Sequence, residues 1–195
     1  MTQALFDTAL AAARDMHADT PAICDFVSWP DDLRFAGRDA RVLPSVTHVQ
    51  DVPGAPCAQT RSLRNALIAV APYAEWRHTY TEAEVGADFL ARFGWFELAG
   101  PTGHFHSDQA RITIGYWGPG LHYDWHEHPP EELYTVVSGS AVFLAEGEAS
   151  VTLGPGGTRF HKSNQRHAMI TDQSPILTLV YWRGDQLDHD PRMSQ

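Results

Sequence analysis

The apolar positions in the N-terminal half of the chain recur every three or four residues, which is the spacing of amphipathic helices. This pattern predicts one helix over residues 5–16 and another over residues 60–71, the second ending before Pro72. A third helix is predicted to begin at the capping box of Thr81 and Glu84 and to end at Gly94. Each helix is expected to pack its apolar face against the outside of a larger core.

The remaining parts of the chain show other patterns. Prolines punctuate residues 21–56, where only residues 41–49 are compatible with extended structure. From Trp95 onward, short apolar and β-branched runs alternate with Gly, Pro, Asn or Asp. The predicted strands cover residues 95–98, 110–117, 133–137, 141–144, 149–153, 158–161, 167–171 and 176–182. Such regularly spaced short strands predict an all-β sandwich or barrel, followed by a solvated tail after Gly184.

Length and composition limit the domain count and the function classes. A chain of 195 residues fits one structural domain, in which residues 1–94 form a helical extension packed on a β-barrel of residues 95–184, with a tail at 185–195. A net charge of -10, from 14 basic and 24 acidic residues, argues against nucleic-acid binding. The apolar runs are too short to cross a membrane. Cys24 and Cys57 form no CxxC motif and fit a reducing, cytoplasmic location.

Chemically distinctive residues gather within residues 120–139, which read GLHYDWHEHPPEELYTVVSG. Side chains two positions apart on a strand share a face, so His126 and His128 are expected to point the same way, as are Glu132 and Tyr134. Two imidazoles and a carboxylate that converge on one point indicate a metal site.

A fourth ligand is expected from elsewhere in the chain, because catalytic metals usually take three or four protein groups. His167 is the best candidate. It follows residues 156–166, a turn, short strand and turn that would return the chain to the first histidine pair.

The spacing of these residues resembles the two sequence motifs of the cupin superfamily. The first motif is matched by Gly120, five residues, His126-x-His128, three residues, Glu132, six residues and Gly139. The second resembles Gly156 through His167, although Lys162 stands where the family usually has proline and Asn164 where it usually has glycine. The resemblance implies a mainly β fold, a single double-stranded β-helix or jelly-roll barrel, with an N-terminal helical extension.

Within the cupins, the segments GPTGHFHSD at residues 100–108 and YDWHEHPPEELY at residues 123–134 resemble the dimethylsulfoniopropionate (DMSP) lyases, most closely the DddQ type. This resemblance implies a metal-dependent carbon–sulfur lyase that releases dimethyl sulfide and acrylate by β-elimination. The implied cofactor is one divalent transition metal, with zinc, iron(II) or manganese as the leading candidates. The implied partner is a small zwitterionic sulfonium substrate, and the protein is expected to be a monomer or homodimer.

The same resemblance assigns roles to aromatic residues. Tyr134 corresponds to the tyrosine held to be the catalytic base. Tyr123 and Trp182 are the favoured aromatic faces for the sulfonium group, with Tyr116 and Tyr181 as further candidates. Strand parity turns Tyr123 outward unless a β-bulge intervenes.

The other histidines of this region have less defined roles. Parity places His122 on the face of His126, where it would line the mouth of the pocket. His104, His106 and His161 are expected to orient a ligand or to lie at the surface.

Two other functions remain open at this point. One is a different metal-dependent cupin enzyme, a dioxygenase or an isomerase, because one ligand set serves many reactions. The other is a non-catalytic metal-binding sensor, although the sequence shows no basic helix of the kind that binds DNA. The tyrosine two residues after the glutamate favours the lyase.

Overall fold

Helices dominate the first half of the computed structural model, which describes residues 2–54 and 57–194. Residues 55 and 56, at the end of the proline-punctuated stretch, lie outside the described residues. The helices are α1 (Thr2–Asp19), α2 (Pro21–Phe26), α3 (Ala58–Val70), α4 (Glu82–Val85) and α5 (Ala87–Arg92), with 3-10 helices η1 (Pro44–Asp51) and η2 (Ala71–Tyr73). The predicted first and second helices are thus confirmed as α1 and α3. No helix in the described ranges has both the length and the apolar character that a transmembrane span requires.

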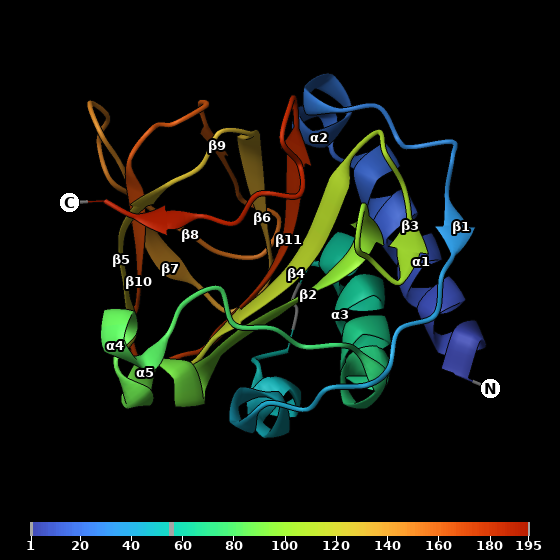
Figure 1. The fold of residues 1–195 in the computed structure, drawn as a ribbon, viewed down its shortest axis with the longest axis horizontal. Helices are drawn as coiled ribbons and strands as arrows, with labels where there is room; N and C mark the ends of the chain where they lie inside the picture. Colours follow the sequence, from blue (N-terminus) through green and yellow to red (C-terminus); the bar gives the residue numbers. More distant parts are fainter. Residues whose placement is uncertain (1, 55–56, 195) are drawn as a thin grey trace.

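Two β-sheets are built from the second half of the chain together with the short strand β1 of the first half (Figure 1). The strands are β1 (Arg34–Phe35), β2 (Phe93–Gly100), β3 (Phe105–His106), β4 (Arg111–Trp117), β5 (His122–Glu127), β6 (Glu131–Ser138), β7 (Ala141–Ala145), β8 (Val151–Leu153), β9 (Thr158–His161), β10 (His167–Thr171), β11 (Ile176–Arg183) and β12 (Arg192–Met193). One sheet has the order β1-β3-β2-β4-β11-β6-β9 and the other β12-β5-β10-β7-β8. Side chains of both sheets pack into one shared cluster, as in a jelly roll, so the predicted fold class is confirmed.

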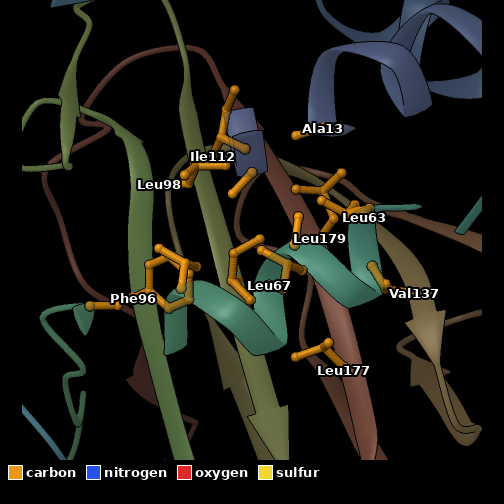
Figure 2. Close-up of a cluster of buried hydrophobic side chains, with 14 of the residues drawn as sticks. Ala13, Leu63, Leu67, Phe96, Leu98, Ile112, Val137, Leu177 and Leu179 are labelled. Atoms are coloured by element: carbon orange, nitrogen blue, oxygen red, sulfur yellow. The ribbon is translucent and has the colours of Figure 1, made fainter. Parts of the chain in front are cut away.

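The helices α1 and α3 cover the outer face of the seven-stranded sheet (Figure 2). Leu63 and Leu67 of α3 meet Leu179 of β11, and Ala13 of α1 lies above the same sheet. Each of these side chains is at most 1% exposed, and a buried leucine stabilises a fold by about 1.5–3 kcal/mol. The helical half therefore leaves the inner face of this sheet free to build a site.

Alternation along β4 shows how the two faces are divided. Ile112, Ile114 and Tyr116 pack toward the helices, whereas residues 111, 113, 115 and 117 line an internal cavity. Both faces of the strand are buried almost throughout, although the sequence RITIGYW still alternates Arg111 and Thr113 on the cavity face with Ile112 and Ile114 on the helix face. The division of the chain at residues 94 and 184 stays a prediction.

The predicted third helix is wrong in its extent. The capping box of Thr81 and Glu84 is present, but α4 ends at Gly86, whose φ of +82° is unfavourable for residues with a side chain. The chain restarts as α5 and enters β2 at Phe93, so Gly94 lies in a strand and caps no helix. A Cβ on Gly94 would lie 2.9 Å from the hydroxyl oxygen of Ser45, so close packing accounts for this glycine.

Two further predictions are corrected. Residues 41–49 are not a strand, because Pro44 begins the 3-10 helix η1, for which its fixed φ is suited. The tail after Gly184 is exposed over most of its length, as predicted, but it is not a free end. Leu187 is buried, and β12 pairs with β5 through Met193 opposite His126. Backbone pairing, which the polar composition of the tail does not reveal, holds it in place.

Gly139, the last glycine of the first motif, is expected to be far less tolerant of substitution than Gly147. Both have similar φ values, +77° and +78°, but a Cβ on Gly139 would collide with the carbonyl oxygen of Pro175, whereas nothing lies within 4 Å of a Cβ on Gly147. Gly147→Ala should cost about 1–2 kcal/mol of unfolding free energy for the left-handed conformation alone. Gly139→Ala should cost at least about 3 kcal/mol, as strain and overpacking add. Urea unfolding of both variants checks this, and equal losses would contradict it.

Candidate metal centre

Three buried side chains converge inside the barrel. His128, Glu132 and His167 each offer one ligand atom, and these atoms all lie within 4.8 Å of one another. The Nε2 atoms of His128 and His167 lie 3.3 and 3.2 Å from Oε2 of Glu132. The loop after β5, strand β6 and strand β10 supply the three residues, so both sheets contribute to the group.

Backbone carbonyls set the tautomers of the two histidines. Nδ1 of His128 lies 2.9 Å from the carbonyl oxygen of Pro130, and Nδ1 of His167 lies 2.8 Å from that of Gln165. A carbonyl oxygen only accepts hydrogen bonds, so each Nδ1 carries the proton. Each Nε2 therefore directs a lone pair toward Glu132, which is the arrangement of metal-binding histidines.

Glu132 is held by a neighbouring strand. The indole N–H of Trp182 on β11 donates to Oε1 of Glu132 over 2.8 Å, which leaves Oε2 for the centre. Burial by itself raises the pKa of this carboxyl, whereas positive charge at His128 and His167, which the rings carry when they are protonated, holds the pKa well below its usual range. Glu132 is therefore a carboxylate, the form that binds a cation.

The residues fit a metal ion. Nε2 of His128, Nε2 of His167 and Oε2 of Glu132 are all buried and have no hydrogen-bond partner among the described residues. Three unpartnered polar atoms that face one another are costly unless a ligand satisfies them. Two imidazoles and one carboxylate suit divalent transition metals, so the group is a candidate centre for one.

His126 lies beside this group and is not part of it. Its ring stacks on Tyr123 with 3.9 Å between ring centroids, and its centroid is 4.1 Å from that of His167. Burial and the neighbouring His167 lower the pKa of His126 well below the usual value, so the ring is neutral. His126 and His128 do share the interior, as parity predicts, but only His128 joins the converging atoms. A ligand role for His126 stays a prediction.

His161 is nearer to the centre than its place in the sequence suggests. It lies opposite Glu132 on the adjacent strand β9 and stacks on His167 with centroids 4.0 Å apart. Neither ring nitrogen has a hydrogen-bond partner among the described residues, and burial lowers the pKa of His161 to about 2. It is a neutral ring that packs against a candidate ligand. His104, by contrast, stacks on Phe6 under helix α1, on the far side of the sheet.

A cavity of about 50 Å³ lies next to Glu132, one of the three candidate ligands. Glu132 and Tyr134 both line it, as the parity of β6 predicts. Five of the eleven other lining residues are aromatic; the eleven are Thr79, Phe93, Trp95, Arg111, Thr113, Gly115, Trp117, Tyr123, Val180, Trp182 and Pro191. Burial, and next the charge of Glu132, raise the pKa of Tyr134 well above its usual value. In the absence of a nearby cation its hydroxyl keeps its proton.

Tyr123 reaches the cavity because β5 contains the bulge that its inward position requires. The pairing passes from His167 opposite His126 to Met169 opposite Tyr123, which spans two residues of β10 and three of β5. The extra residue turns Tyr123 inward, where its hydroxyl lies 2.8 Å from that of Tyr80.

The bulge also turns His122 outward. The side chain of His122 is 56% exposed, so the prediction that it shares a face with His126 and lines the pocket is wrong. Tyr116 and Tyr181 were further candidates for the pocket wall, but they pack in the cluster beneath the helices. His106 is partly exposed and lies 3.5 Å from Asp108, in keeping with a surface role.

Several residues that line the cavity were not predicted from the sequence to have a functional role. Phe93, Trp95, Arg111 and Trp117 line it from β2 and β4. The parity of β4 places residues 111, 113, 115 and 117 on one face, so Arg111 and Trp117 carry a usable signal. Nothing in the sequence indicates which face of a doubly buried strand is the inner one.

Comparison with known proteins was decisive for the family. A family model described as dimethylsulfoniopropionate lyase matches residues 33–178. The chain belongs to this family. Dimethylsulfoniopropionate lyase DddQ from Ruegeria pomeroyi DSS-3 is 38% identical over 184 residues, which are 94% of this chain and 92% of the relative.

Solved structures of DMSP lyases are also similar to this member of the family. A chain from the crystal structures of the DMSP lyases RdDddP and RnDddQII is 56% identical and has a TM-score of 0.97, with both chains fully covered. The crystal structure of DMSP lyase DddQ from Ruegeria pomeroyi DSS-3 is 37% identical with a TM-score of 0.92, covering 97% of this chain and 96% of that one. The whole fold, helices included, is therefore that of these DMSP lyases.

Proposed function

We propose that this protein cleaves DMSP to dimethyl sulfide and acrylate, with one divalent transition metal, zinc, iron(II) or manganese, as its cofactor. Membership of the DMSP lyase family carries the proposal. The unpartnered atoms of His128, Glu132 and His167 support it, and so does the position of Glu132 in the wall of a cavity with five other aromatic lining residues besides Tyr134, because a metal next to a cation-binding surface is what this substrate requires.

The reaction is a β-elimination in which one C–H and one C–S bond break. A base removes a proton from the carbon next to the substrate carboxylate, the C–H electron pair forms the double bond of acrylate, and the C–S pair leaves with sulfur. Tyr134 is the proposed base because it lines the cavity on the same strand face as Glu132. A divalent cation bound at the three ligand atoms would polarise the carboxylate and favour the phenolate of Tyr134.

The dimethylsulfonium group of the substrate is a soft cation without N–H donors. Such cations bind best against aromatic faces. Tyr123 and Trp182, the residues expected from the sequence, both line the cavity, and Phe93 and Trp117 add two further rings. We assign the sulfonium group to these rings, which exclude water from the reacting carbon.

The hydroxyls of Tyr123 and Tyr80 form a pair that is poorly suited to removing a proton. Burial is the main cause that raises the pKa of both phenols well above the usual value. Both hydroxyls therefore keep their protons, and the hydrogen bond between them fixes the ring of Tyr123 in the cavity wall. Burial raises the pKa of Tyr134 as well, so the feature that separates the candidates is the hydrogen bond that engages the hydroxyl of Tyr123, and Tyr134 is the preferred base.

The proposal predicts chelator-sensitive release of dimethyl sulfide. Purified protein loaded with metal and given DMSP should release dimethyl sulfide into the headspace, and a chelated sample should release little until metal is restored, since the substrate carboxylate would lack its Lewis acid. Gas chromatography of the headspace measures this. The absence of release with each of iron, manganese, zinc, cobalt and nickel would contradict the lyase function. The cytoplasmic location and the monomeric or homodimeric state stay predictions.

A further inference from the structure

Arg111 is a buried cation stacked between two tryptophans at the edge of the cavity. Its guanidinium carbon lies 4.9 Å from the ring centre of Trp95 and 4.8 Å from that of Trp182. Trp182 in turn packs against His128, with 4.3 Å between ring centroids. A continuous stack of planar groups therefore runs from Trp95 to a candidate metal ligand.

The same guanidinium holds the C-terminal tail. Nη1 of Arg111 donates to the carbonyl oxygens of Leu187 and His189 over 3.1 and 3.0 Å, and Nη2 lies 3.4 Å from Oδ1 of Asp190. Pro191, the next residue, lines the cavity. The tail thus reaches the cavity at Pro191, next to the residues that Arg111 holds and before β12 pairs with β5.

Arg111 has little capacity left to bind a substrate carboxylate. Nε donates to Oε2 of Glu97 over 3.0 Å, so the bonds to Glu97 and the tail use four of the five N–H groups of the guanidinium. Glu97 also balances the charge of this arginine, whose side chain is 5% exposed. The paired N–H groups needed to grip a carboxylate are already occupied.

The two sets of contacts meet at Trp182. Its indole N–H donates to Oε1 of Glu132, and its ring touches both Arg111 and His128. A shift of the Arg111 side chain would therefore move a ring that orients two of the three candidate ligands. Groups that orient metal ligands affect metal affinity and rate although they touch neither metal nor substrate.

We propose that Arg111 is a positioning residue that couples the C-terminal tail to the metal centre. The tail holds the guanidinium in place, the guanidinium holds Trp182, and Trp182 holds Glu132 and His128. The effect on catalysis rests on the proposed lyase function, whereas the effects on metal affinity and on the tail do not.

Arg111→Lys tests the coupling while preserving a positive charge. A lysine ammonium has three donors on one atom and no planar fork, so it would not hold Glu97, both carbonyls and the stack together. We expect a 10–100-fold loss in kcat and weaker metal binding in competition with a chelator. KM should change less than kcat. Hydrogen exchange measured by mass spectrometry should be faster across residues 185–194.

Arg183→Lys is the matched control. Arg183 is adjacent to Trp182, stacks over Phe26 at 4.4 Å and pairs with Glu131, so it combines the same kinds of contact. None of the contacts described for it reaches the tail or the cavity. This variant should retain wild-type kcat, metal affinity and tail exchange.

Leu187→Ala provides an independent test from the side of the tail. Leu187 packs its buried side chain in the cluster that includes Trp182, and its carbonyl accepts from Arg111. Loosening it should reproduce part of the Arg111→Lys phenotype: faster exchange, lower kcat and weaker metal binding. The Leu187→Ala variant therefore tests the proposal even if Arg111→Lys does not fold.

Three outcomes would overturn the proposal. The first is a folded Arg111→Lys protein with unchanged kcat and metal affinity, regardless of its hydrogen-exchange rate across residues 185–194. The second is a rise in KM at unchanged kcat, which would make Arg111 a substrate-binding residue. The third is faster tail exchange in Leu187→Ala without any effect on metal affinity. If the wild-type protein releases no dimethyl sulfide, the lyase function fails, but metal affinity and exchange still decide the coupling.

Discussion

Tyr134→Phe is expected to lower kcat for dimethyl sulfide release by at least about 100-fold, because general-base catalysis by a positioned side chain contributes about 10²–10⁴-fold. Phenylalanine keeps the ring that packs 5.5 Å from Phe143 and 6.2 Å from Trp117, measured between centroids, so the cavity should retain its shape. Metal affinity should change little relative to the loss in kcat. Headspace assays with metal analysis of the same samples separate the two effects.

Tyr181→Phe is the control for removing a buried phenol from this barrel. Tyr181 is fully buried beneath the helices, and its hydroxyl has no hydrogen-bond partner among the described residues. Removing this hydroxyl should leave kcat unchanged. If Tyr134→Phe retains wild-type turnover and Tyr123→Phe loses it, the base is Tyr123, and the assignment of Tyr134 is wrong.

Strand parity predicted much of the inner wall but failed at one local irregularity. It correctly placed Glu132 and Tyr134 on one face of β6, since that strand pairs regularly with β9 at these residues. It placed His122 on the wrong face because the bulge in β5 lies between His122 and His126. The bulge adds one residue, and a shift by one residue moves the side chains beyond it to the opposite face. A bulge has no fixed sequence signal, so parity alone left Tyr123 undecided.

Long-range pairing accounts for the other differences. The polar composition of the tail suggests a solvated end, yet Arg111, more than seventy residues away in sequence, donates hydrogen bonds to two carbonyl oxygens of the tail. Trp182 was expected to be an aromatic face, but the register of β11 against β6 also places its N–H on Glu132. Such roles depend on which strands become neighbours, and a single sequence does not specify this.

The candidate metal centre was the most predictable feature, because its candidate ligands obey local spacing. Residues four apart across a tight loop, such as His128 and Glu132, meet wherever the loop turns the chain back. His167 joined them through a second motif with its own turn signals. His126 shows the limit, since spacing places it in the interior but does not determine which neighbouring ring it will stack against.

Glu132→Gln is expected to weaken metal binding by more than about 100-fold. Losing a residue that only orients a metal ligand typically costs roughly 10–100-fold in affinity, and losing a ligand itself should cost more. The amide keeps the shape and an oxygen for the Trp182 N–H, but it removes the negative charge on which both candidate histidine ligands converge. Dimethyl sulfide release should fall with metal occupancy. Metal-linked stabilisation should also shrink, by about 1.4 kcal/mol for each tenfold loss in affinity.

Glu131→Gln separates this effect from a general loss of negative charge on β6. Glu131 is the preceding residue, and it is partly exposed and paired with Arg183 over 2.8 Å. Exposed pairs of this kind contribute about 0–1 kcal/mol, so metal affinity and turnover should remain at the wild-type level. Thermal unfolding with and without added metal measures the stabilisation in all three proteins. A Glu132→Gln protein with full metal occupancy and an undiminished thermal shift would remove Glu132 from the ligand set. The two histidines would then have to bind the metal with other ligands.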